Sequence, residues 1–307
     1  MTLATWIQNC EDDLDIKWLA INSNPKLIPY LESNPDLIDW YMLSTNSLAI
    51  ELLKKNKNCI YWSNICLNSH PDAIGLIRNH HEHYINKWIN KHRRIPYDMM
   101  LSWENLSQNP SAIEFLEEYP FNELWSVQEP PYDPQQDDHD YAGNVYFETV
   151  VPDYQIDWLF MSQNAKGLQL LQKNPEKIMW DSFSNNTDKD AIELLRENHD
   201  KINWYWLSQN PEAMDVLESN LDKIVWPQLS KNPNAIPLLE ANPDKIDWTY
   251  LSANPNAIEL LESNIDKIDW RWLCKNPNAG RLLETHIENV YDKLDWQWLS
   301  ANPCIFI

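Results

Sequence analysis

Apolar residues return along the chain in a unit of about 22 residues, and each unit fits two short amphipathic helices. The clearest copy is DWTYLSANPNAIELLESNIDKI, in which Ala257, Ile258 and Leu261 have the spacing of one helical face. Glu259 and Glu262 fall on the opposite face. This pattern predicts a short helix that buries one side and exposes carboxylates on the other.

Asn-Pro pairs recur where these helices are expected to begin. Asn254 offers a side-chain cap to free backbone N–H groups, and Pro255 fits the first turn because it has no N–H. In several copies a second pair, such as Asn242-Pro243, starts the other half of the unit. Isolated helices below about 12 residues are marginal in water. The units are therefore expected to stack on one another, as in other repeat proteins.

Tryptophan sets the expected register of the repeats. The same spacing of about 22 residues separates Trp248 from Trp270, and also Trp18 from Trp40. A ring of this size would fill the space that such short helices leave open. We expect the tryptophans of the C-terminal copies to occupy equivalent buried places: Trp158, Trp180, Trp204, Trp226, Trp248 and Trp270.

These features predict an all-α fold, namely an α-solenoid of short helix pairs with a repeat of about 22 residues. The alternative is a leucine-rich-repeat horseshoe, whose unit has a similar length but contains a strand with strict alternation. Here Ile246, Asp247 and Trp248 alternate only briefly before Tyr250 and Leu251 break the pattern. Two helix starts in each unit also favour the helical alternative.

The repeats fall into two blocks. We place an N-terminal block at residues 1–125, with an irregular register at 66–102, and a regular C-terminal block at 156–307. Residues 126–155 are rich in Pro and Asp and out of register, so a connecting loop is expected there. The final ANPCIFI stands where another helix would begin, as a truncation or as an apolar cap.

Composition narrows the classes of function. The 307 residues carry a net charge of -22, which disfavours direct nucleic-acid binding, because that requires clustered Lys and Arg. The chain has 17 Trp and 20 Pro but only 4 Gly. It contains no Gly-rich phosphate loop, no nucleophile elbow and no plausible catalytic triad. We therefore expect a protein that is not an enzyme and has no cofactor.

Three further features bear on the compartment. No apolar run reaches about 18 residues, so no membrane span is expected. The first residues are acidic and lack the apolar core of a signal peptide, so secretion is not expected. The cysteines are odd in number and match no zinc spacing, which favours reduced thiols: Cys10, Cys59, Cys66, Cys274 and Cys304.

A histidine cluster is the one group with the composition of a metal site. It comprises His80, His81, Glu82, His83 and His92. The spacing differs from the H-E-x-x-H motif of zinc enzymes. We therefore expect a solvated insertion between helices that holds no metal.

Two groups of residues are candidates for partner contacts. Trp206, Tyr250, Trp272 and Trp298 share the repeat position two residues after Trp, which varies in type. Variable aromatic residues on a repeat scaffold suit partner binding. The alternative is that these rings cover gaps between repeats.

The second group is the only dense basic run of the chain. It consists of Lys87, Lys91, Arg93 and Arg94. Such a run would dock an acidic surface of a partner or nucleic acid, or it would pair with acidic residues of the protein itself.

Charged residues also line up at fixed positions of the unit. Ordinary solvated faces are the simplest interpretation, and a surface for a basic partner or a nucleic-acid mimic is the alternative. The acidic rows are Glu51, Glu114, Glu193, Asp215 and Glu259, and Glu32, Glu117, Glu218, Glu240, Glu262 and Glu284; the lysine row is Lys177, Lys201, Lys223, Lys245, Lys267 and Lys293.

The repeat pattern N-P-x-A-I-x-L-L-E-x-N-P-D-K-I-D-W resembles that of tandem-repeat proteins of giant nucleocytoplasmic large DNA viruses. The resemblance covers most of residues 155–303 and, more loosely, 16–125. It implies a viral origin, a place in the virion or the host cytoplasm, and a binding or structural role.

Three functions are compatible with these features. We expect a protein–protein interaction scaffold of a large DNA virus, with other virion proteins among its partners. The alternatives are a virion structural component such as a minor capsid protein, and an acidic nucleic-acid mimic that acts as a regulator.

Overall fold

The protein is helical throughout the parts that the structure describes. The computed structural model describes residues 3–91, 100–118 and 156–306, and within them the only β-type pairing is an isolated bridge between Leu3 and Phe306. The predicted all-α class is therefore confirmed. The connecting loop expected at 126–155 lies outside the described residues, as do His92, Arg93 and Arg94.

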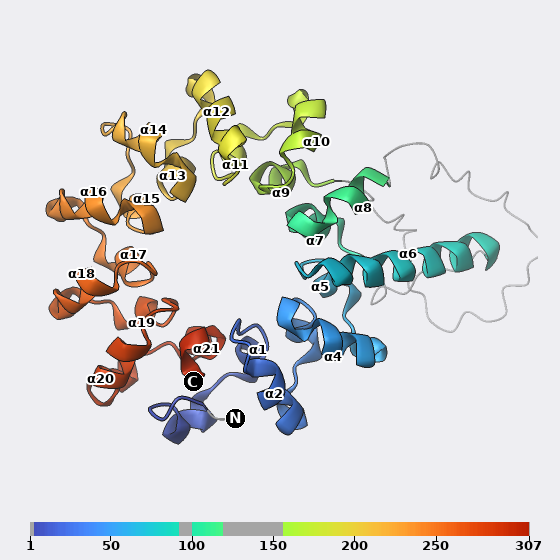
Figure 1. Cartoon of the computed structure of the whole chain (residues 1–307), viewed down its shortest axis with the longest axis horizontal. Coiled ribbons are helices and arrows are strands. Elements are labelled where there is room, and N and C mark those ends of the chain that lie inside the picture. The colour runs from blue at the N-terminus through green and yellow to red at the C-terminus, as the bar shows by residue number, and fades with distance from the viewer. Residues whose placement is uncertain (1–2, 92–99, 119–155, 307) are drawn as a thin grey trace, which may run out of the picture.

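Short helices alternate between an inner and an outer position around a ring (Figure 1). The inner helices are α1 (Ile16–Leu19), α3 (Trp40–Leu43), α5 (Trp62–Ile65), α7 (Trp103–Gln108), α9 (Trp158–Gln163), α11 (Trp180–Phe183), α13 (Trp204–Ser208), α15 (Trp226–Leu229), α17 (Trp248–Ser252), α19 (Trp270–Leu273) and α21 (Trp296–Ala301).

The outer helices cover the inner ones from outside. They are α2 (Leu27–Ser33), α4 (Ile50–Lys55), α6 (Pro71–Lys91), α8 (Ile113–Glu118), α10 (Leu168–Lys173), α12 (Lys189–Glu197), α14 (Met214–Glu218), α16 (Ile236–Glu240), α18 (Ile258–Glu262) and α20 (Gly280–Val290). Three of them, α8, α14 and α16, follow a short 3-10 turn that begins at the predicted Asn-Pro pair, as at Pro233–Ala235.

One buried asparagine per repeat holds neighbouring repeats together. In Asn254, the side-chain Nδ2 donates to the carbonyls of Ser230 and Asn232 in the preceding repeat, at 3.0 and 2.9 Å. Its Oδ1 accepts from the backbone N–H of Asn256 at 3.0 Å and so caps the outer half of its own repeat. The same side chain therefore starts a helix and joins two repeats. The equivalent asparagines are Asn22, Asn46, Asn68, Asn109, Asn164, Asn186, Asn210, Asn232, Asn276 and Asn302.

A serine or cysteine forms a second ladder beside the asparagines. Ser252 Oγ donates to the carbonyl of Trp248 at 2.7 Å and accepts from the N–H of Asp269 in the next repeat at 3.0 Å. Cys274 takes this place one repeat later, with Sγ 3.3 Å from the carbonyl of Trp270 and 3.4 Å from the nitrogen of Asp295. Burial raises the pKa of the Cys274 thiol to about 12.

All five cysteines lie in the described part of the chain and none forms a disulfide. Cys66 occupies the same ladder position as Cys274 and donates to the carbonyl of Trp62 at 3.1 Å. Burial raises its pKa to about 12 as well. These two thiols therefore serve as protonated hydrogen-bonding groups in the core.

The repeats stack continuously from the first predicted block to the second. The N–H of Asp157 donates to Ser107 Oγ at 2.9 Å, and Asn164 Nδ2 donates to the Ser107 carbonyl at 3.0 Å. On the outside, Lys173 pairs with Glu117 at 2.8 Å. Helices α7 and α9 thus pack as neighbouring repeats, although residues 119–155 separate them in the sequence.

The stack of helix pairs closes into a ring, because its first repeat packs on its last. Asn22 Nδ2 donates to the carbonyls of Ser300 and Asn302 at 2.9 and 2.7 Å, and the N–H of Asp15 donates to Ser300 Oγ at 2.8 Å. Bonds of the same two kinds join neighbouring repeats elsewhere in the ring, as at Asn254 and Ser252. Helices α1 and α21 lie side by side as a result (Figure 1).

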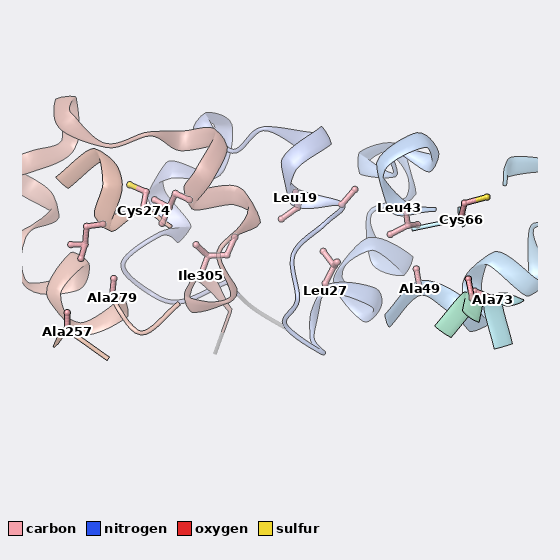
Figure 2. Packing of buried hydrophobic residues seen from close by; sticks show 14 of the residues in the cluster. Leu19, Leu27, Leu43, Ala49, Cys66, Ala73, Ala257, Cys274, Ala279 and Ile305 are labelled. Atoms are coloured by element: carbon pink, nitrogen blue, oxygen red, sulfur yellow. The ribbon is translucent and has the colours of Figure 1, made fainter. Parts of the chain in front are cut away.

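Residues from both ends of the chain complete the outer half of the closing repeat. The N–H of Ala4 donates to the carbonyl of Ile305 at 2.7 Å, next to the bridge between Leu3 and Phe306. Figure 2 shows Ile305 in line with Ala279 on one side and Leu27 on the other, so the core crosses the junction without a break. The apolar tail thus packs against the N-terminal segment.

The structure corrects the register of the first repeat. Helix α1 begins at Ile16, so Ile16 takes the place of the repeat tryptophan. Trp18 stands two residues further on, at the position of Trp206 and Trp272, and is not equivalent to Trp40. The spacing of about 22 residues between Trp18 and Trp40 is a coincidence, because the first two repeats are 24 residues apart, from Asn22 to Asn46.

The expectation that the repeat tryptophans are buried is correct for only part of the set. They occupy equivalent places at the start of the inner helices. Trp103 and Trp270 are buried at 5% and 8% exposure, whereas the other repeat tryptophans are half-buried against the core. One face of these rings is therefore left for other contacts.

We predict that the asparagine at the junction matters as much as one in the middle of the stack. Asn22→Ala and Asn254→Ala each remove a cap and the side-chain donor to two carbonyls of the neighbouring repeat. Both should lower the free energy of unfolding by about 2–4 kcal/mol, measured by urea denaturation. A neutral Asn22→Ala beside a destabilising Asn254→Ala would contradict ring closure.

We also predict that Cys274 is exchangeable for serine. Cys274→Ser keeps both ladder bonds and should change the free energy of unfolding by less than about 1 kcal/mol. Cys274→Ala leaves the Asp295 N–H unpaired and should cost about 1–3 kcal/mol. Equal effects of the two substitutions in thermal and urea denaturation would show that the thiol makes no useful hydrogen bond.

Candidate partner-binding surface on the inner helices

The inner helices turn two of their residues away from the core. In α13, Leu207 and Ser208 are fully buried. Successive residues of a helix are about 100° apart, so Tyr205 and Trp206 lie on the opposite side. They are 45% and 37% exposed. The inner helices lie nearest the centre of the ring (Figure 1), and these two side chains lie on the side of α13 that is turned away from the core.

Most of the large apolar side chains that the described residues expose belong to this inner surface. They lie on an inner helix or directly before one, and each is at least 37% exposed. These exposed side chains are Ile16, Tyr41, Tyr61, Leu159, Met179, Tyr205 and Trp206. Only Trp206 was predicted from the sequence, because that prediction covered only the position two residues after the repeat tryptophan.

The predicted aromatic row is continuous over three of its four members. The ring of Trp272 lies 5.2 Å from that of Tyr250 and 5.4 Å from that of Trp298, measured between centroids. Trp206 is separate, because the repeat between it and Tyr250 carries the buried Gln228 at this position. Its ring instead meets Tyr205 at 5.3 Å, edge to face.

Cations of the protein itself cover the continuous part of the row. Lys231 Nζ lies 4.0 Å from the centroid of Tyr250, and Lys275 Nζ lies 3.7 Å from that of Trp298. Desolvation lowers the pKa of both lysines, since burial disfavours their charged form. Rings covered in this way are less open to a partner than Tyr205 and Trp206.

The predicted lysine row also packs on aromatic rings. Lys201, Lys245 and Lys267, near the end of a unit, each place Nζ 4.3–4.4 Å from the centroid of the tryptophan near the start of the same unit, namely Trp180, Trp226 and Trp248. These lysines therefore cover the half-exposed tryptophans and hold the two halves of a unit together. A cation over an aromatic face contributes about 0.5–1 kcal/mol at an exposed site.

The acidic rows on the outer helices are joined to neighbouring repeats by ion pairs. Lys54 contacts both Glu51 and Asp72 of the next repeat, at 2.7 and 2.6 Å. Arg196 contacts Glu193 and Asp215 in the same manner. Exposed pairs of this kind contribute about 0–1 kcal/mol each. Part of the acidic surface is thus engaged in contacts within the protein.

The basic run is placed only in part. Lys87 and Lys91 lie near the end of the long outer helix α6, and Arg93 and Arg94 lie outside the described residues. Within residues 66–102, where we expected an irregular register, α6 covers Pro71–Lys91, and residues 92–99 lie outside the described part of the chain. This outer helix has 21 residues and is longer than the other outer helices.

The expectation that the histidine cluster is a solvated insertion is wrong for His80 and His81. Both are buried on α6. The His80 ring stacks on Trp62 at 3.5 Å, and the His81 ring meets Phe115 at 5.7 Å. His83 is exposed. Sequence inspection missed this because histidine is polar, while its ring packs like an aromatic side chain once it is neutral.

No group of three or more His, Cys, Asp or Glu side chains in the described residues is arranged to hold a metal ion. Within the same residues, no helix is long and apolar enough to cross a bilayer.

We predict that His81 makes the protein sensitive to acid. Burial, and then the charge of His80, lowers the pKa of His81 from 6.5 to about 4. The unfolded chain therefore binds a proton that the folded chain rejects between these pH values, and stability falls as pH drops from about 6.5 to about 4. The loss amounts to at most about 3 kcal/mol.

The measurement is the pH dependence of urea unfolding, with His81→Phe as the control that cannot titrate. The variant should lose less stability than the original protein over this range, and the two should run parallel above pH 7. Parallel curves down to pH 4 would show that His81 is protonated in the folded state.

Known proteins offer no relative from which a function could be inferred, so the inference rests on the chemistry of the surface. No protein-family model, curated protein or solved structure matches the chain.

Proposed function

We propose that this chain is a non-enzymatic scaffold that binds other proteins through the inner surface of its ring. The observation that carries the proposal is the concentration of exposed aromatic and aliphatic side chains on the inner helices, among them Tyr41, Tyr61, Tyr205 and Trp206. Exposed apolar groups gathered on one surface are typical of interaction sites. Tyrosine and tryptophan in particular dominate the binding energy of protein interfaces.

The rigidity of the ring supports this role. The asparagine and serine ladders bond each repeat to the next, so the inner side chains are held in fixed relative positions. A preorganised surface loses less conformational entropy on binding than a flexible one. The outer surface offers less, because several of its carboxylates already pair with lysine or arginine of the adjoining repeat.

The origin in a large DNA virus, and virion proteins as partners, follow only from the resemblance of the repeat pattern. The minor capsid alternative and the scaffold differ in where the protein resides. Fractionation of purified virions and of infected cells distinguishes them, since a capsid component remains with the particle.

The proposal is tested by comparing protein partners of the original chain and of two variants. Tyr205→Ser combined with Trp206→Ser should abolish capture of specific partners, because it removes two adjoining exposed aromatic rings. Leu221→Ser is the matched control, since Leu221 is 50% exposed but lies between an outer and an inner helix. Co-purified proteins are identified by mass spectrometry, and thermal melting checks that each variant is folded.

Retention of every partner by the Tyr205→Ser/Trp206→Ser variant, or equal loss with Leu221→Ser, would contradict binding through the inner surface.

A further inference from the structure

We propose that the inner surface across α9, α11 and α13 binds an arginine side chain presented by an extended segment of a partner protein. This inference rests on the proposed function and names the chemistry of the partner. The residues concerned, called the open strip below, are Leu159, Met179, Asp181, Tyr205 and Trp206.

The open strip is continuous across three consecutive repeats. The residue that follows one repeat tryptophan lies beside the residue that precedes the tryptophan of the next repeat. The Tyr41 and Tyr61 rings meet in this way, with centroids 5.2 Å apart. Leu159 and Met179 hold the same two positions in the open strip, so we infer that they lie side by side; they are 43% and 48% exposed.

The next pair in the strip is polar and leads directly to Trp206. Asn203 Nδ2 donates to Asp181 Oδ1 at 2.8 Å. Asn203 Oδ1 in turn accepts from the N–H groups of Tyr205 and Trp206, at 3.1 and 3.4 Å. Two apolar side chains, one carboxylate and an aromatic pair therefore follow one another along the surface.

The protein contains its own version of the proposed contact, four repeats further along the ring. Arg271 is the residue after Trp270, which is the position of Asp181 in α11. Its Nε donates to Asp295 Oδ2 at 3.2 Å, and its Cζ lies 5.1 Å from the centroid of Trp298. A guanidinium thus lies on the ring and pairs with a carboxylate beside it.

In the open strip the ring and the carboxylate are present, but no described residue places a cation on them. Trp206 stands where Trp298 stands, and Asp181 supplies a carboxylate at the adjoining position. Among the residues that the structure describes, no Lys or Arg lies over the rings of Tyr205 or Trp206, and none pairs with Asp181.

The sequence of the repeats explains why no lysine covers Trp206. Lys231 and Lys275, five residues after the repeat tryptophan, cover rings of the following repeat. The corresponding residue before Trp206 is Asn185, which bonds Gln209 instead.

The chemistry of the strip selects arginine in a polypeptide. A guanidinium is planar, stacks on an indole ring and bonds a carboxylate with two N–H groups. Leu159 and Met179 provide an apolar surface for the residues that flank the arginine in an extended chain. The net charge of -22 attracts a basic segment and repels a nucleic acid, whose bases would also stack on Trp206.

The test measures binding of a labelled dodecapeptide with one central arginine flanked by leucines, by fluorescence anisotropy at low salt. The same peptide with citrulline, which has the same shape but no charge, should bind at least about tenfold more weakly. Trp206→Ala should weaken binding of the arginine peptide about tenfold, and Asp181→Asn several-fold. Leu221→Ser should leave it unchanged.

A second variant keeps the whole strip and fills it from within. Asn185→Lys places a lysine at the repeat position of Lys231, which covers Tyr250. The new side chain should therefore lie over Trp206 and abolish peptide binding. Asn185→Gln is the matched control and should bind normally. Thermal melting confirms that both proteins are folded.

Several results would overturn the inference. They are equal affinity for the arginine and citrulline peptides, unchanged binding by Asn185→Lys, and preference for a single-stranded oligonucleotide over the peptide. If partner capture still depends on Tyr205 and Trp206 in such a case, the scaffold function stands and only the arginine partner is wrong. If the arginine peptide does not bind selectively and partner capture does not depend on Tyr205 and Trp206, the scaffold function is contradicted as well.

Discussion

The structure depends on the hydrogen bonds that the buried asparagine side chain of each repeat must form. A buried asparagine side chain has two N–H donors and an acceptor, and each left unbonded would cost about 1–3 kcal/mol. The chain satisfies Asn254 by placing two carbonyls of the preceding repeat and one N–H of its own repeat around it. Since the equivalent asparagines form bonds of the same kind, the spacing and orientation of neighbours are fixed by hydrogen-bond geometry. Apolar packing of short helices would not fix them alone.

Charge is distributed so that it supports the same stacking. The net charge of -22 would favour expansion of the ring through self-repulsion. Cations are placed where they oppose this, with Lys231 and Lys275 on aromatic rings of the following repeat and Lys54 between carboxylates of two repeats. These positive groups therefore connect repeats, and the surface around Trp206 has no such lysine at the equivalent position, which is Asn185.

Local features of the fold could be predicted from the sequence, and global ones could not. Asn254-Pro255 correctly marked the start of an outer half, because capping depends on residues that are close in sequence. Trp18 was placed in the wrong register, and aligning Leu19 and Asn22 with Leu43 and Asn46 would have corrected it. The candidate site was predicted only as a position, since whether a ring is covered depends on a residue in another repeat: Lys231 covers Tyr250, whereas Asn185 leaves Trp206 open. Ring closure depends on a small rotation per repeat that no local pattern encodes.

Closure makes the order of synthesis matter for folding. The amide of Asn22 and the N–H of Asp15 require Ser300 and Asn302, and Ser300 leaves the ribosome 285 residues after Asp15. Until then the nascent chain carries an unbonded donor edge at one end and grows an unbonded acceptor edge at the other. The donor edge of one copy fits the acceptor edge of any other copy equally well. Chains synthesised side by side on one messenger RNA can therefore pair with each other before each chain pairs with its own C-terminal repeat. Slow translation of the final repeat would therefore favour linear polymers over single rings.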